Sequence, residues 1–491
     1  MREAFGRNLA FGVFLVVCLL AHDSLCQTFT VGGSQEIGGA APAIVGVGPV
    51  TITATGNPLW DGGTDADWVY TWSGYDRVAL SDEALTYTRY SNPSTTPTTY
   101  YDRGTITFDL GGADLGGSDD DGTISVAAVR NRTGTGTDPS RNYRTDHVAI
   151  TNVGDIGIGG IDTGDDTTSN THYPHPGYIT IGEEAARAGQ IRIGFIYANA
   201  GAETRGNSTG GHADLAIYGS GAVRIENAAG SLGSIVLGST VNGSGSTATI
   251  NHFGELKAHI IDISKWNGNF ACGSLTLNGG DASGNLQVGS LRAYRNGGNY
   301  PGEAGDITIA LYANVAIGEI QAWNYDSTPN AGHTRDGGNV TITNGIPGNI
   351  TIDGEINLRR ELSSDPGSVN GTLDLACSGT VTLAALDLDK VHHAALDSGK
   401  GASVITGVLT NFDTTATGGS GSRGVPYVTS QTALRAPEGQ DIYYSYEAEG
   451  VNDYLGGFYY RIANMAGEPG EGGCLRLSPA LIPGGSMLIL K

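Results

Sequence analysis

The feature that most constrains the fold is a repeat of about 33 residues in the middle of the chain. Each unit begins with a triplet in which two apolar residues flank a small or polar one, after glycine or a polar residue. Successive triplets begin 31, 36, 33, 27, 32, 33 and 33 residues apart. They lie at 148–150, 179–181, 215–217, 248–250, 275–277, 307–309, 340–342 and 373–375. Self-similarity at a fixed period of this length is typical of stacked repeat architectures.

Each unit contains two further short strands. A second triplet follows about ten residues on, as at 191–193 and 315–317, and a third strand follows a glycine, as at 318–320. A long polar loop, such as 294–305, closes the unit. Strands this short do not form a free-standing sheet, so each unit buries its isoleucines, valines and leucines only by stacking on its neighbours.

These observations predict an all-β, right-handed parallel β-helix of about eight coils. Period-two alternation turns Ile307 and Ile309 inward and Thr308 outward. Glycine at the corners supplies the conformations that tight turns require, and the crossover rule for parallel strands gives the handedness. A β-sandwich has strands every 8–12 residues without this self-similarity, and a propeller has blades of about 40–45 residues.

The first residues have the layout of an export signal. Arg2 and Arg7 precede an apolar run at 9–21, and small residues precede Gln27, which predicts a signal peptide over 1–26 cleaved after Cys26. The apolar run is too short to span a bilayer. A lipoprotein attached through Cys26 is the alternative. The protein is therefore expected to be secreted or displayed at the cell surface, with no transmembrane segment in the mature chain.

The remaining segments divide by composition. We predict a β-rich N-terminal cap over 27–100 and the β-helix over 101–415, with its regular repeat over 147–410. Residues 416–424 are rich in glycine and serine and are expected to form a flexible linker. Tightly spaced tyrosines over 425–491 indicate a small β-rich C-terminal module.

The charge and the cysteine content limit the possible partners and disulfides. The formal net charge is −23 with no basic stripe, which argues against nucleic acid as a partner. After signal cleavage three cysteines remain, so at least one is a free thiol or forms an intermolecular bond. Cys272 and Cys377 lie too many coils apart for a disulfide. Cys377 alternates in phase with Leu373 and Leu375, which predicts a buried thiol.

The sequences Ala-Gly-Asp-Ile-Thr-Ile at 304–309 and Gly-Gly-Asn-Val-Thr-Ile at 337–342 resemble the repeat of filamentous-haemagglutinin and autotransporter-passenger adhesins. The resemblance covers roughly residues 147–410. It implies a bacterial, secreted or surface-displayed β-helix. The chain departs from that family in its short length and in lacking a recognisable secretion domain or a C-terminal membrane barrel.

Two sets of acidic residues are candidates for catalysis. Enzymes that act on acidic polysaccharides through this fold, such as polygalacturonases, carry ordered acidic, histidine and cationic motifs. The nearest strings here are 144–146, the pair Asp165 and Asp166, 211–213 and 224–226, and all but the aspartate pair are altered. Glu319 and Glu355 follow glycines at matching places in adjacent coils and would form an acid/base pair or a Ca²⁺ site. The alternative is a solvated pair, neutralised by a cation such as Arg359.

Two further groups are candidates for binding. Asp114, Asp119, Asp120 and Asp121 offer hard oxygen ligands for Ca²⁺ within one loop, although the order is not that of an EF-hand. Tyr294 and Trp323 follow matching alanines in neighbouring coils, with Tyr300 and Tyr325 nearby. An outward aromatic row would bind sugar rings or a protein, and the alternative is loop packing against the coil.

The sequence favours a secreted or surface-displayed structural or adhesive rod without catalytic activity, with a polysaccharide or a cell-surface protein as its ligand. A polysaccharide lyase or glycoside hydrolase acting on an acidic polysaccharide is the alternative. Stacking accounts for nearly every glycine, isoleucine and valine of the repeat, which leaves few residues that require a catalytic explanation.

Overall fold

The computed structural model describes most of the repeat region and isolated strands at both ends of the chain. The described residues are 28–31, 34–37, 50–55, 68–72, 77–80, 85–91, 105–131, 145, 147–164, 176–199, 212–238, 245–266, 271–296, 302–325, 336–343, 348–360, 368–399, 402–410, 427–428, 434–435, 441–446, 459–465 and 474–480. The predicted signal peptide, the linker at 416–424 and the pair Asp165 and Asp166 lie outside them.

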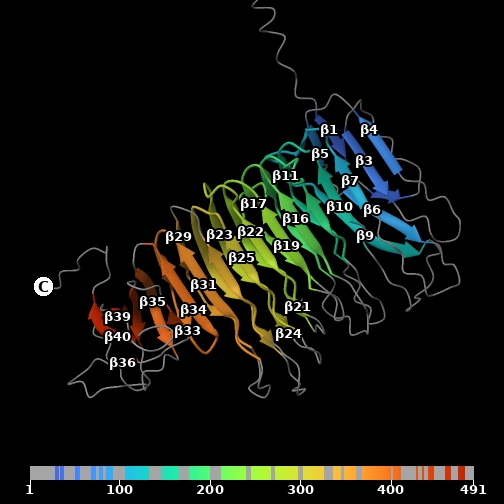
Figure 1. The fold of residues 1–491 in the computed structure, drawn as a ribbon. Coiled ribbons are helices and arrows are strands. Elements are labelled where there is room, and N and C mark those ends of the chain that lie inside the picture. Colours follow the sequence, from blue (N-terminus) through green and yellow to red (C-terminus); the bar gives the residue numbers. More distant parts are fainter. Residues whose placement is uncertain are drawn as a thin grey trace, which may run out of the picture.

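The repeat region forms a parallel β-helix, as predicted (Figure 1). The eight predicted triplets lie side by side in one parallel sheet and in the expected register, so that, for example, Ile307 pairs with Leu275 on one side and Val340 on the other. The strands are β10 (His147–Thr151), β13 (Ile179–Ile181), β16 (Asp214–Tyr218), β19 (Thr247–Asn251), β22 (Leu275–Asn278), β25 (Ile307–Ala310), β28 (Val340–Thr343) and β31 (Thr372–Cys377).

The number of coils differs from the eight expected. In the same sheet β7 (Thr105–Asp109) precedes β10, and β34 (His393–Ser398) and β37 (Leu434–Arg435) follow β31. Residues 105–131 thus contain regular coil strands, although their sequence departs from the repeat.

The second and third strands of each coil form one large sheet. Early coils keep the two strands separate, whereas β20 (Leu256–Asp262), β23 (Asn285–Arg292) and β26 (Asn314–Gln321) run through both. The others are β8 (Asp114–Gly116), β9 (Thr123–Asn131), β11 (Ile156–Ile158), β12 (Gly160–Asp162), β14 (Ile191–Ile193), β15 (Ile196–Ala198), β17 (Val223–Ile225), β18 (Ser234–Leu237), β29 (Asn349–Ile352), β30 (Ile356–Asn357), β32 (Val381–Leu383), β33 (Leu386–Asp387) and β35 (Ala402–Thr410). A third, small sheet holds β21 (Lys265–Trp266), β24 (Arg295–Asn296) and β27 (Asn324–Tyr325).

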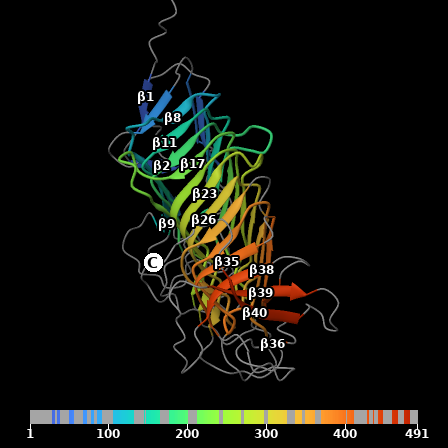
Figure 2. The same ribbon diagram turned by 90° about the vertical axis from the view of Figure 1, so that its left-hand side faces the viewer.

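Antiparallel strands appear towards both ends of the rod (Figure 2). Near the N-terminus β3 (Val50–Thr55) lies between β4 (Trp68–Trp72) and β7, while β1 (Thr28–Val31) and β2 (Ser34–Ile37) extend the large sheet in parallel through β5 (Arg77–Leu80) and β6 (Leu85–Ser91). Near the C-terminus β38 (Asp441–Tyr446), β39 (Tyr459–Met465), β40 (Cys474–Ala480) and β36 (Tyr427–Val428) pair antiparallel. No helix among the described residues is long and apolar enough to cross a membrane.

The core is a continuous column of aliphatic side chains along the axis. Ile307 and Ile309 are fully buried while Thr308 between them is exposed, which confirms the alternation. Cys377 lies buried in the same phase as Leu373 and Leu375, as expected, and both Cys272 and Cys377 are free thiols.

The acidic or amide residue before the first triplet caps the next coil. Asp306 Oδ1 accepts a hydrogen bond from the amide of Asn339 at 2.8 Å, and Asn339 Oδ1 accepts one from the amide of Thr372 at 3.0 Å. Asp214 Oδ1 accepts one from the amide of Thr247 in the same way. The Gly-Asp and Gly-Asn steps of the repeat therefore link successive coils by hydrogen bonds at the start of the first strand.

Candidate functional site

Outward residues at equivalent positions of successive coils form columns along the rod, and the candidate residues lie in such columns. Ser290 pairs in register with Glu319, and Ile320 pairs with Ile356, so Glu355 lies beside Glu319 in the next coil. The two glutamates therefore occupy matching places, as the sequence predicts.

A hydroxyl, an amide and two cations satisfy the two carboxylates. Glu319 Oε1 accepts hydrogen bonds from Ser290 Oγ at 2.7 Å and from Arg292 Nη2 at 3.1 Å. Glu355 accepts one from Lys390 Nζ at 2.7 Å and one from Gln321 Nε2 at 3.1 Å. The two glutamates are thus neutralised by cations, as the alternative expected, but the cations are Arg292 and Lys390 and not Arg359.

These contacts keep both glutamates ionised. The hydrogen bond from Ser290 and the nearby Arg292 hold the pKa of Glu319 below its ordinary value. The hydrogen bond from Lys390 lowers the pKa of Glu355, although the neighbouring Glu319 opposes this. A general acid working near neutral pH needs a raised pKa, so the arrangement fits an ion-paired sheet surface better than an acid/base pair.

Replacing Lys390 with methionine is expected to move acid unfolding to higher pH. Because the pKa of Glu355 is lowered in the folded chain, its contribution is present above the unfolded pKa of about 4.5 and is lost as pH falls through the lowered value. Without Lys390 that contribution shrinks, by about 0.2–1 kcal/mol for a partly exposed pair. Acid-unfolding curves followed by circular dichroism measure the shift. Arg359→Met is the matched control and should leave the curve in place, and an equal shift in both variants would contradict the pairing.

The aromatic row forms as predicted. Tyr294 and Trp323 stack with their ring centroids 4.6 Å apart and their planes within 1° of parallel. Tyr325, which is 39% exposed, meets Trp323 edge-on at 6.4 Å. Tyr300 lies outside the described residues. Because Tyr294 and Trp323 cover one face of each other, the row offers a sugar ring less open aromatic surface than two separate rings would. The geometry favours packing between coils over a sugar-binding platform.

The structure does not bring the loop aspartates together as a calcium site. Asp114 Oδ1 accepts a hydrogen bond from the amide of Asp155, and Asp120 accepts hydrogen bonds from the amides of Leu80 and Gly122. Asp121 Oδ1 accepts one from the amide of Ala228. Within the described ranges, which include Asp119, no three acidic, histidine or cysteine side chains gather closely enough to hold a metal ion. These aspartates instead satisfy backbone amides at the coil corners.

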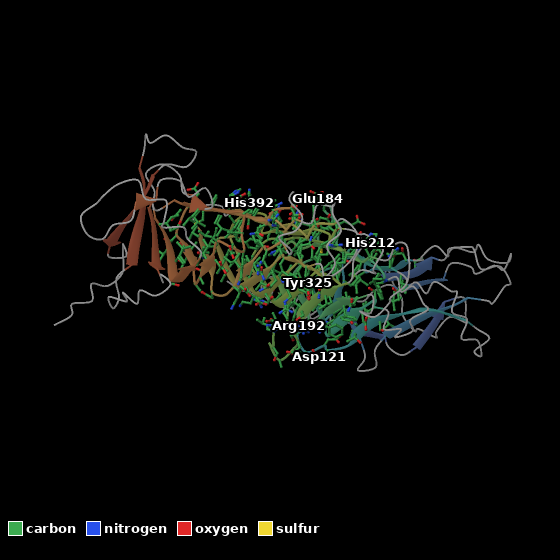
Figure 3. All side chains as sticks on the ribbon, turned by 90° about the horizontal axis from the view of Figure 1, so that it is seen from below. Asp121, Glu184, Arg192, His212, Tyr325 and His392 are labelled. Carbon is green, nitrogen blue, oxygen red and sulfur yellow. The ribbon has the colours of Figure 1, made fainter. Side chains whose placement is uncertain are left out.

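Of the strings compared with polygalacturonases, the described residues His212 and Arg224 lie on different sheets of the rod, and most of 144–146 and all of 165–166 lie outside the described residues. His212 lies just before β16 in the first sheet, where Nε2 is 3.0 Å from the hydroxyl of Tyr178 and 3.4 Å from Asp214 Oδ2. Arg224 lies on β17 in the large sheet. Figure 3 shows His212 and Arg192, the neighbour of Arg224 in the preceding coil, on opposite sides of the rod.

Sequence reasoning missed a groove on the outer face of the large sheet, with a volume of about 260 Å³. Arg77, Arg192 and Arg224 line it, and its floor includes Gly116 and Gly157. Alternation places Arg192 and Arg224 outward, as the second residues of their triplets. It gives no sign that the Arg192 side chain turns back along the rod across the preceding coil.

A second group that the sequence did not reveal lies inside the rod. Lys265, Arg295 and Asn324 occupy equivalent positions of the small sheet and are almost completely buried. Burial lowers the pKa of Lys265 to about 8. Arg295 Nη1 donates a hydrogen bond to Asn324 Oδ1 at 3.1 Å. The sequence predicts a polar loop at 294–305, whereas Arg295 near its start lies buried in the interior of the rod.

Comparison with known proteins gives no identification. No family model, no curated protein and no solved structure matches the chain.

Proposed function

We propose that this protein is an exported bacterial rod, secreted or displayed at the cell surface, that serves a structural or adhesive role without catalytic activity. The proposal extends the resemblance to filamentous-haemagglutinin and autotransporter-passenger adhesins. The observation that carries it is the unbroken register of the first sheet. From β10 to β31 alone, seven spacings of about 4.8 Å give roughly 34 Å of continuous rod.

The side chains on the rod surface support the same proposal. Glu319 and Glu355 are paired with cations, and Tyr294 and Trp323 stack on each other. A polysaccharide lyase or hydrolase needs two carboxylates placed about a bound sugar, one of them with a raised pKa. Asp262 does have a raised pKa because it is desolvated, but its Oδ1 accepts a hydrogen bond from the amide of Ser264 in a corner turn. Asp162 and Asp387 make the same turn in other coils, which indicates a structural role.

A screen against acidic and neutral polysaccharides tests the proposal. The mature chain is expected to be retained on at least one immobilised polymer or on intact bacterial cells, and to release no reducing ends or unsaturated sugars. Detection of product would contradict the proposal, and loss of that product in Glu319→Gln or Asp166→Ala would identify the catalytic carboxylate. Absence of both retention and product would leave a purely structural rod.

A further inference from the structure

The groove on the large sheet is a trough floored by glycine. Outward positions in this column carry Gly116 on β8, Gly157 on β11, Arg192 on β14 and Arg224 on β17, one per coil. Two successive residues without side chains leave a hollow that the next two coils edge with guanidinium groups. A Cβ at Gly116 would lie 1.9 Å from the carbonyl oxygen of Gly157, and one at Gly157 would lie 2.3 Å from that of Gly117, so glycine at both positions lets the coils approach closely along the floor.

Two arginines meet at one residue of the trough floor. Arg192 reaches back over Gly157 and donates hydrogen bonds from Nη2 to the carbonyls of Gly117 and Asp120, at 2.7 and 2.8 Å. Arg77 lies over Gly117 from the other end, and a Cβ on that residue would come within 2.9 Å of Arg77 Nη1. Both guanidinium groups therefore approach Gly117, and an anion bound there would interact favourably with each of them.

The hydrogen-bonding capacity of both arginines is incomplete. Arg77 Nε and Arg192 Nη1 are buried and have no hydrogen-bond partner within the described part of the chain. Asp121 Oδ1 is 3.8 Å from Arg192 Nη1, beyond hydrogen-bond distance, and Figure 3 shows the two side chains on the same side of the rod. Arg224, by contrast, is satisfied by Glu255 at 3.1 Å. Buried donors without partners are rare in folded proteins and indicate a missing acceptor.

Acceptors along the other edge of the trough indicate what kind of anion fits. Asp114, Asp155 and Glu226 line it. Asp114 and Asp155 each accept a hydrogen bond at Oδ1 from a backbone amide of the next coil, and within the described residues their Oδ2 atoms accept none. A bare inorganic anion would be repelled by these carboxylates. A ligand that carries both a carboxylate and hydroxyl groups would place the first against the arginines and the second against the aspartates.

We propose that this trough binds uronic-acid residues of an acidic polysaccharide, with Arg77 and Arg192 holding the sugar carboxylate and Asp114 and Asp155 accepting its hydroxyls. The trough crosses five successive coils, from β5 to β17, and so follows the rod for about four spacings of 4.8 Å. The inference gives a ligand class to the proposed adhesive rod. It rests on that proposal only for the extracellular location in which the protein would encounter the ligand.

Titration calorimetry of the mature chain with oligogalacturonate tests the inference. Binding is expected, and it should weaken at least tenfold in Arg77→Met, whose side chain holds no backbone group in the described structure. Arg192→Lys keeps the charge but loses the forked geometry and should also weaken binding. Arg359→Met, an exposed arginine on another part of the rod, is the control and should bind as the parent does. Raising the salt concentration should weaken binding of the parent chain.

Three results would overturn the inference: no binding of oligogalacturonate, equal binding of a neutral galacto-oligosaccharide of the same length, or sulfate binding as tightly as the sugar acid. Unchanged affinity in both Arg77→Met and Arg192→Lys would place any binding elsewhere. These outcomes are distinct from failure of the proposed function, because release of product contradicts a non-catalytic rod whether or not the trough binds.

Discussion

Replacing Gly338 with alanine is expected to destabilise the rod by about 3 kcal/mol, a large loss for a single methyl group. A Cβ at Gly338 would lie 2.1 Å from the carbonyl oxygen of Gly305 in the preceding coil, and one at Gly371 would lie 1.9 Å from that of Gly338. The obstructing atoms are backbone atoms directly before the first strand of each coil, and the amides of Gly305 and Gly338 are held by the carbonyls of Ala293 and Ala322, so relief requires the coils to separate. The substitution therefore acts on the stacking itself.

Gly230→Ala is the matched control. Gly230 has a φ of +78° in a turn, and a Cβ there meets nothing within 4 Å. Only the cost of the left-handed conformation applies, about 1 kcal/mol, part of which is offset by the smaller entropy of the unfolded chain. Chemical denaturation followed by circular dichroism compares the two variants. Equal losses of unfolding free energy would show that the backbone conformation of glycine, and not the distance between coils, determines the cost of the substitution.

The stacked glycines Gly305, Gly338 and Gly371 show a part of the fold that the sequence did not predict. The spacing of the triplets was sufficient for the β-helix and for its register, because only stacking in register buries every isoleucine. The glycines were expected to supply turn conformations, and Gly182, Gly254 and Gly280 do have positive φ. Gly305 and Gly338 do not, and they are glycines because of contacts between coils 33 residues apart. Such contacts become visible only once the register is known.

The arrangement of the candidate site residues was likewise predicted only in part. Register predicted that Glu319 would lie beside Glu355 and that Tyr294 would stack on Trp323, because each pair sits at one position of the repeat. It did not predict which cations would neutralise the glutamates. Lys390 belongs to the following coil and contacts Glu355 through a long flexible side chain. Whether such a side chain makes this contact depends on the side chains packed between the two residues.

The aspartates at the coil corners show a different limit. Composition alone made Asp114 and Asp120 resemble ligands for calcium, since carboxylate oxygens suit that ion. In the rod the same oxygens accept hydrogen bonds from backbone amides at the coil corners, which have no partner in the strand ladder. A sequence gives the number of acceptors but not the number of corner amides that compete for them.

The thiol of Cys272 is expected to react about a thousandfold more slowly with an aromatic disulfide reagent in the folded chain than after denaturation. Burial raises its pKa to about 12, although the nearby Lys265 opposes this, and Cys272 Sγ lies 3.2 Å from the carbonyl oxygen of Ile263. The residue as a whole keeps partial exposure, but it is the ionisation of the sulfur that sets the rate. At pH 7 the thiolate fraction falls from about 10⁻² for a thiol of pKa 9 to about 10⁻⁵ at pKa 12.

The pH dependence separates this effect from simple exclusion of the reagent. Because the folded pKa is raised, the reaction rate of the native thiol should keep rising about tenfold per pH unit above pH 9, where that of the denatured chain levels off. Peptide mass spectrometry after timed labelling reads Cys272 separately from Cys377, and Cys272→Ser confirms the assignment. A native rate that levels off near pH 9 would show an ordinary thiol open to solvent. A protonated, hydrogen-bonded thiol is also a poor nucleophile in thiol–disulfide exchange, because the thiolate is the attacking species.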